Sequence, residues 1–230
     1  MKRWFFRGLY VFAFGFHSLL WLNFWLEGPR EALALVTMSF GLLVIWGGLG
    51  GWLQLKLHAR LSSQPYQSAW KNFAMLFVAL VGMALLAEVV STTMTNTAVL
   101  WGFSPREVYI TASPNYLEVV LKHSVIVFLP QFIVLAWLHQ RYAFQPWHWF
   151  IIYGLVGYLN EWLAFGEAAS LVSLPFWMII YGNIAYTPTS RFLPQTLRKP
   201  LRLHILLGAV FLTFLVAIPW AMVLLAWLHS

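Results

Sequence analysis

Long apolar stretches alternate with short polar connections along the whole chain, and each stretch reaches the roughly 17–25 residues that a transmembrane helix takes. There are seven of these stretches, at 4–26, 32–55, 73–100, 116–139, 147–164, 168–186 and 204–228. Backbone groups in hydrocarbon must find partners inside their own segment, and the stretches are too long and too continuously apolar for barrel strands. The pattern therefore predicts an all-α fold: a polytopic membrane helix bundle of seven transmembrane helices, in one integral membrane domain, 1–230.

The composition leaves no room for a separate water-soluble domain. Of the 230 residues, 61% are hydrophobic and 9% are charged, whereas soluble domains carry about 25% charged residues. The chain contains no cysteine, which excludes disulfides, thiolate metal sites and cysteine nucleophiles. It also contains no aspartate, so an aspartate-rich site for magnesium and diphosphate is excluded.

The basic residues predict the orientation, because short cytoplasmic loops carry an excess of lysine and arginine. Eleven basic residues fall on the side of the N-terminus: Lys2, Arg3, Arg7, Lys56, Arg60, Lys71, Arg141, Arg191, Arg198, Lys199 and Arg202. Two lie on the other side, Arg30 and Arg106, and Lys122 lies within the fourth stretch. We expect the N-terminus in the cytoplasm, the C-terminus outside, and the protein in a bacterial or archaeal inner membrane. The net charge of +7 then needs no nucleic-acid partner.

All seven acidic residues fall in the outer half of this topology or in its outer loops. They are Glu27, Glu31, Glu88, Glu107, Glu118, Glu161 and Glu167. Acidic residues contribute little to orientation, so their asymmetry needs a separate reason. Glu88, Glu118 and Glu161 lie within the spans, where one ionised group costs about 2.5–3.5 kcal/mol on insertion scales. We expect these three side chains to pair or to line a cavity and not to face lipid.

Helical spacing gathers further polar residues around the three glutamates. Glu88 is followed by Ser91, Thr92, Thr95 and Asn96, which share one side of a helix.

The fourth and fifth stretches add a second group of polar residues. Glu118 precedes Lys122 by four residues, the better order for a helical ion pair, and His123 follows directly. Asn160 and Glu161 are adjacent on the fifth stretch.

These residues form the predicted site, in the outer half of the bundle. Its candidate catalytic residues are Glu88, Glu118, Lys122, His123 and Glu161, and its candidate substrate-binding residues are Thr92, Asn96 and Asn160. A glutamate would act as general acid, the lysine and histidine would stabilise negative charge or shuttle protons, and the amides would orient the substrate. The alternative is a set of structural hydrogen bonds between helices.

The pattern favours an enzyme that acts on an isoprenoid or another lipid, and two other functions stay open. One is a non-catalytic subunit of a larger membrane complex with partner subunits, and the other is a small transporter coupled to cations or protons. The histidine pairs of desaturases, HExxH and GxSxG are absent. We expect no cofactor and no metal, although a metal held by the three buried glutamates with His123, or a haem between His17 and His123, would be compatible with the residue types.

Overall fold

The computed structural model describes residues 2–60, 68–165, 171–191, 199–220 and 222. Within these residues the fold is all-α, without strands, and the helices join end to end into seven rods. The first three rods are α1 (Lys2–Glu27); α2 (Arg30–Leu42) with the π-helical η1 (Leu43–Gly50) and α3 (Gly51–Arg60); and α4 (Ala69–Asn96) with the 3-10 turn η2 (Thr97–Trp101). The fourth rod consists of α5 (Tyr116–Glu118), the π-helical η3 (Val119–His123) and α6 (Val125–Arg141). The last three are α7 (Pro146–Phe165); α8 (Leu174–Arg191), preceded by the 3-10 turn η5 (Leu171–Ser173); and α9 (Leu203–Leu215).

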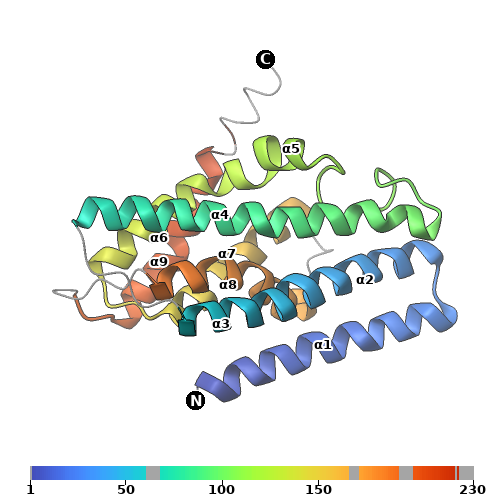
Figure 1. The fold of residues 1–230 in the computed structure, drawn as a ribbon, viewed down its shortest axis with the longest axis horizontal. Helices are drawn as coiled ribbons and strands as arrows, with labels where there is room; N and C mark the ends of the chain where they lie inside the picture. The colour runs from blue at the N-terminus through green and yellow to red at the C-terminus, as the bar shows by residue number, and fades with distance from the viewer. Residues whose placement is uncertain (1, 61–67, 166–170, 192–198, 221, 223–230) are drawn as a thin grey trace.

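Among the described residues, four stretches of helix are long and apolar enough to cross a membrane. They are Trp4–Glu27, Arg30–Gln54, Ala69–Trp101 and Leu203–Trp220. The bent pair Tyr116–His123 and Val125–Arg141, whose axes differ by 51°, gives a fifth if it is one span. α7 and α8 are not in this group. They run through the middle of the bundle in Figure 1 and supply many of its buried core residues.

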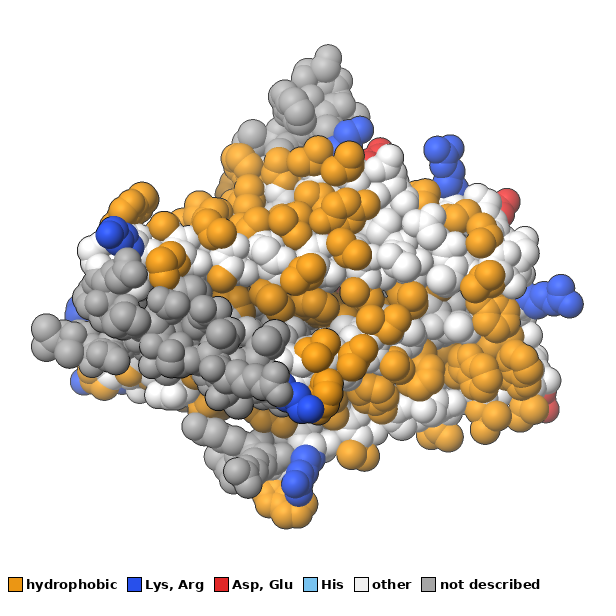
Figure 2. Space-filling view, in the orientation of Figure 1, with side chains coloured by type: hydrophobic (Ala, Val, Ile, Leu, Met, Phe, Trp, Pro, Cys, Tyr) orange, Lys and Arg blue, Asp and Glu red, His pale blue; other side chains and the backbone are white. Residues whose placement is uncertain are grey.

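The rods lie roughly side by side, so that the connections gather at two ends (Figure 1). The turn between α1 and α2 and the loop 102–115 are at one end, and the N-terminus of α4 is at the other. Apolar side chains cover much of the face seen in Figure 2, with few charged side chains between the ends. This is the surface that a helix bundle presents to hydrocarbon.

α7 and α8 approach each other more closely than a side chain on α7 would allow. A Cβ atom at Gly154 would lie 2.8 Å from Cα and 2.9 Å from the carbonyl oxygen of Met178, and one at Gly157 would overlap the ring of Tyr181. Small residues permit such backbone contact between membrane helices. The two glycines, three residues apart on one face, thus set the distance between α7 and α8.

The sequence pattern puts the sixth span at 168–186, and the start of that stretch, 168–170, lies outside the described residues. η5 and α8 cover the rest of the stretch, and α8 continues beyond it to Arg191. The polar C-terminal turn remains helical because its hydroxyl groups bond back to the helix: Thr189 Oγ1 donates to the Ala185 carbonyl at 2.7 Å, and Ser190 Oγ donates to the Thr187 carbonyl at 2.8 Å.

Two π-helical segments interrupt the described rods. The glycine-rich η1 winds as π-helix, and the Gly47 carbonyl within it accepts hydrogen bonds from Tyr10 Oη at 3.2 Å and Asn183 Nδ2 at 3.4 Å. The second segment, η3, is followed at Ser124 by a φ of −117° and a ψ of −78°, which leave the α-helical range. π-Helical segments often occur at functional sites, and the second of them borders the cavity described next.

Candidate functional site

A cavity of about 570 Å³ opens between α4, η3, α6, α7, α8 and the residues that follow α9, Ala217, Ile218 and Met222. Among the described residues, nine polar ones line it: Glu88, Ser91, Thr111, Lys122, His123, Ser124, Asn160, Glu161 and Tyr181. The rest of the lining is apolar and includes Ala87, Phe128, Trp177 and Ile180. Five of the eight predicted site residues therefore border one cavity, and Thr92, Asn96 and Glu118 do not.

α4 contributes Glu88 and Ser91 to the cavity wall. Ser91 Oγ donates a 2.8 Å hydrogen bond to Glu88 Oε2, and the hydroxyl of Ser124 also contacts the Glu88 carboxyl group. Three residues separate Glu88 from Ser91, which places both on one face of the helix. Two hydroxyl groups, those of Ser91 and Ser124, thus contact the Glu88 carboxyl group, and Glu88 lines the cavity.

α7 and α8 contribute the second carboxyl group of the cavity and its partner. The Tyr181 hydroxyl donates a hydrogen bond to Glu161 Oε1. Its ring lies beside Gly157, one helical turn before Glu161, so the missing side chain at 157 gives the ring its place. No residue that the structure describes donates to Glu161 Oε2. Glu88 lies close enough for its charge to act on Glu161 and Tyr181.

Asn160 borders the same cavity and is tied to α6. Its side-chain amide pairs with that of Gln131, with N–O distances of 3.4 and 3.5 Å. Gln131 is fully buried beside Pro130 in α6. Each amide gives and accepts one hydrogen bond, so the pair joins α6 to α7 next to Glu161.

The bend at Ser124 forms the polar rim of the cavity. Lys122 and His123 are both exposed and both line the cavity. η3 ends where Ser124 turns the backbone, and the Ser124 amide and hydroxyl group bond to the Val119 carbonyl at 2.9 and 3.3 Å. A straight helix would continue past the cavity, whereas the 51° bend brings its two basic side chains to the edge.

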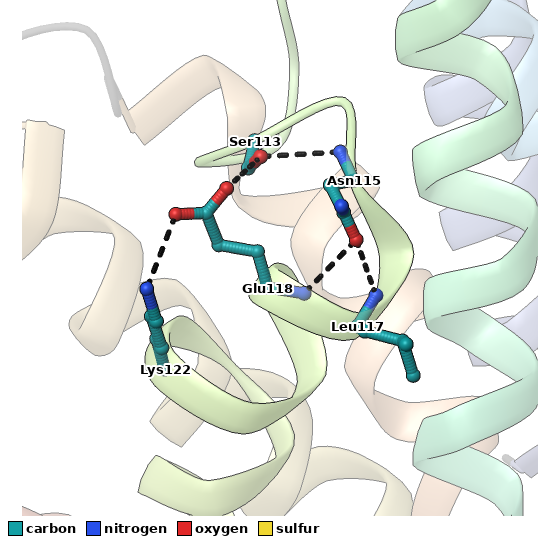
Figure 3. Close-up of polar contacts among 5 residues, drawn as sticks. All are labelled: Ser113, Asn115, Leu117, Glu118 and Lys122. Carbon is teal, nitrogen blue, oxygen red and sulfur yellow. Dashed lines mark hydrogen bonds and ion pairs between the residues drawn. The ribbon is translucent and has the colours of Figure 1, made fainter.

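Glu118 lies outside the cavity lining and stabilises the start of α5 (Figure 3). Its carboxyl group accepts a 2.7 Å hydrogen bond from Ser113 Oγ and forms an ion pair with Lys122 at 3.6 Å. The Asn115 side chain caps the same turn by accepting from the amides of Leu117 and Glu118. The predicted pair of Glu118 with Lys122 is present, and it holds Lys122 beside the rim.

The other two predicted residues outside the cavity lining belong to α4. Asn96 Nδ2 donates to the carbonyls of Thr92 and Pro114, each at 2.9 Å. Thr95 Oγ1 lies 2.9 Å from Thr111 Oγ1 and accepts from the Ile110 amide at 3.3 Å. These contacts fix the loop 102–115 onto α4. The Thr92 hydroxyl is buried with no partner among the described residues.

The geometry offers little for the two metal-based alternatives. In the described part of the chain, no three histidine or carboxylate side chains gather closely enough to hold a metal ion. His17 is buried against Phe176, with ring centroids 4.9 Å apart, and its Nδ1 contacts the Ala13 carbonyl at 2.9 Å. His17 thus packs as a core residue on α1, and Glu167 lies outside the described residues.

Three residues near the carboxyl groups were not part of the predicted site: Ser124, Tyr181 and Tyr153. The Tyr153 hydroxyl is fully buried with no hydrogen-bond partner among the described residues, and its ring lies 6.2 Å from that of Tyr181. The sequence contained one signal for Tyr181. Gly154 and Gly157 leave the α7 face before Glu161 without side chains, which makes room for a large side chain from a neighbouring helix. The sequence contained none for the bend at Ser124.

Comparisons with known proteins give no family to which this site can be referred. No protein-family model matches the chain, and no match was found among curated proteins or among solved structures.

Proposed function

We propose that this protein is an integral membrane enzyme that transfers protons on a lipophilic substrate, an isoprenoid or another lipid. The observation that carries the proposal is the position of Glu88 and Glu161 on the wall of one largely apolar cavity. Ionisable groups inside the membrane are costly and mark functional sites. Each of the two is also oriented by a hydroxyl group, Ser91 for Glu88 and Tyr181 for Glu161.

Two carboxyl groups in one cavity can carry out a balanced reaction without a further reagent. A protonated carboxyl group gives its proton to one carbon of an alkene, and an ionised one removes a proton from another carbon. The substrate is then isomerised or cyclised, and the total number of protons on the enzyme is unchanged. Lys122 and His123 at the rim would stabilise negative charge or return protons, and Asn160 would orient the substrate.

The test compares lipids from a strain that lacks the gene with the same strain complemented by three forms of the protein. These are the wild type, the double variant Glu88→Gln/Glu161→Gln, and the control Glu107→Gln. We expect a lipid whose chromatographic retention or amount changes with the wild type and the control but not with the double variant. Identical lipid extracts from all strains, with each protein present in the membrane, would refute the enzyme. A subunit or a transporter would then be the better description.

We also propose that all seven rods span the membrane, with the N-terminus in the cytoplasm of a bacterium or archaeon and the C-terminus outside. The packing supports this proposal, because α7 and α8, which are not among the stretches long and apolar enough to cross a membrane, supply many of the buried core residues. The orientation is supported by the eleven basic residues that lie on the same side as the N-terminus, in the N-terminal segment and in the connections between spans.

The absence of native cysteine allows a direct test of topology by single cysteines. In intact cells, a membrane-impermeant maleimide is expected to label Tyr109→Cys and Ser230→Cys and to leave Gln145→Cys unlabelled. After permeabilisation all three should react, which controls for accessibility. Labelling of Gln145→Cys in intact cells, or protection of Ser230→Cys, would contradict the seven-span arrangement.

A further inference from the structure

The cavity is bordered by exposed side chains of two kinds. Leu163, Ile218 and Met222 line it and are also exposed on the outside of the bundle, at 56%, 38% and 66%. Leu163 lies near the C-terminal end of α7, and Ile218 and Met222 follow α9 (Leu203–Leu215) in the chain. Lys122 and His123 are the exposed polar residues of the lining. The cavity therefore has an apolar mouth, through which a molecule can enter from hydrocarbon, and a separate polar rim.

The lining of the cavity disfavours a charged head group of either sign. A phosphate would face the carboxyl groups of Glu88 and Glu161, and the nearest cation, Lys122, is already paired with Glu118 at 3.6 Å. An ammonium group would lose its hydration in a cavity whose lining is mostly apolar. An uncharged group meets neither penalty.

A hydroxyl group matches the donors and acceptors that are present. Glu161 Oε2 receives no hydrogen bond from any described residue, so it can accept one from a ligand. Glu88 places a second carboxyl group on the same cavity wall. A ligand hydroxyl both donates and accepts, and it can therefore donate to a carboxylate oxygen and accept from a protonated carboxyl group at once.

The volume limits the ligand to a single chain. Water occupies roughly 30 Å³ per molecule in the liquid, and a methylene group is of similar size. The cavity of about 570 Å³ therefore holds on the order of 19 such groups. A lipid with two acyl chains exceeds this number, whereas a hydroxyl group on one chain of about 16 carbons fits.

We infer that the ligand of this cavity is a single-chain lipid alcohol, whose hydroxyl group binds at Glu161 and Glu88 and whose chain lies in the cavity toward its apolar mouth at Leu163, Ile218 and Met222. The inference takes from the proposed function only that the cavity binds a lipophilic molecule. It adds the head group, the number of chains and the path of entry.

The test uses three probes that share a chain and differ in head group: hexadecanol, hexadecyl phosphate and hexadecylamine. Binding of tritiated hexadecanol to the purified protein in detergent is measured by scintillation proximity, with each unlabelled probe as competitor. We expect hexadecanol to compete about tenfold better than either charged probe, or more, which corresponds to about 1.4 kcal/mol. Equal or better competition by the phosphate or the amine would overturn the inference.

A pair of variants three residues apart separates binding in the cavity from partitioning into the micelle. Ile218→Trp places a large ring at the apolar mouth and should weaken hexadecanol binding about tenfold or more. Leu215→Trp is the control, because Leu215, the last residue of α9, is also exposed but does not line the cavity. Equal binding by both variants would contradict the cavity as the site.

The outcome is separable from that of the enzyme proposal. Selective binding of hexadecanol with unchanged lipid extracts would leave the inference intact and refute the enzyme. Changed lipid extracts without selective binding of the alcohol would leave the enzyme intact and refute the inferred head group.

Discussion

Gly154→Ala is expected to lower the free energy of unfolding by about 1–3 kcal/mol, the usual cost of overpacking. The added Cβ would lie 2.8 Å from Met178 Cα and 2.9 Å from the Met178 carbonyl oxygen. Both atoms belong to the backbone, so a rotamer change cannot relieve the clash and the whole of α8 must move. The measurement is the thermal unfolding midpoint of the purified protein in detergent, which should fall by several degrees.

Gly82→Ala is the matched control for this substitution. Gly82 also lies within a long helix, α4, but a Cβ atom there would have no neighbour within 4 Å. Because alanine favours helix over glycine, this variant should be as stable as the wild type or slightly more so. If the two variants unfold at the same temperature, the backbones of α7 and α8 are not in the contact described.

The contact between α7 and α8 also determines the geometry of the site. The Tyr181 ring lies where a side chain at position 157 would be, and its hydroxyl group reaches Glu161 one turn further along α7. A larger residue at 157 would displace the ring and with it the hydrogen bond. The packing of two glycines thus orients a carboxyl group on the cavity wall.

The apolar pattern of the sequence was sufficient to predict the rods and their order. Helix occupies most of the described part of each predicted stretch. α8 continues past residue 186, where hydropathy falls along Tyr186–Arg191 and the hydroxyl groups of Thr189 and Ser190 bond to carbonyls of their own helix. Hydropathy measures transfer to lipid and does not register such local hydrogen bonds.

Tyr181 was not predicted as a partner of Glu161. The sequence placed it near the inner end of the sixth span, whereas in the structure Tyr181 lines the cavity and donates to Glu161 Oε1. Glu88 and Glu161 could be predicted, because the cost of a charge in hydrocarbon depends on depth alone. The partner of each depends on how the helices are rotated, which one sequence does not contain.

The loop 102–115 was the other part of the site that the sequence left undetermined. Asn96 and Glu118 have the residue types of a polar site, yet they bond to the Pro114 carbonyl and to Ser113 Oγ. Polar residues near the end of a span can serve either a cavity or the adjacent loop. Only the path of the loop separates the two roles, and that path depends on local caps such as Asn115.

Glu161→Gln is expected to reduce turnover of the native lipid about 10²–10⁴-fold, the contribution of a general acid or base. Glutamine keeps the size of the side chain and an oxygen that can accept the Tyr181 hydroxyl hydrogen, but it cannot transfer a proton. Tyr181→Phe should have a smaller effect, because the carboxyl group remains and loses only the hydrogen bond that orients it. Turnover is measured on the lipid that changes in the complementation experiment, with purified protein reconstituted into vesicles.

Glu107→Gln controls for the loss of a negative charge. Glu107 lies in the loop 102–115 and does not border the cavity, and its carboxylate accepts a hydrogen bond from the Ser104 amide at 2.9 Å. It should retain wild-type turnover. All variants should unfold near the wild-type temperature, which separates a chemical role from a structural one. If Glu161→Gln retains turnover as Glu107→Gln does, proton transfer does not pass through Glu161. The hydrogen bond from Tyr181 to Glu161 would then have a structural role only. It would hold α7 against α8 and would partly offset the cost of a carboxyl group inside the membrane.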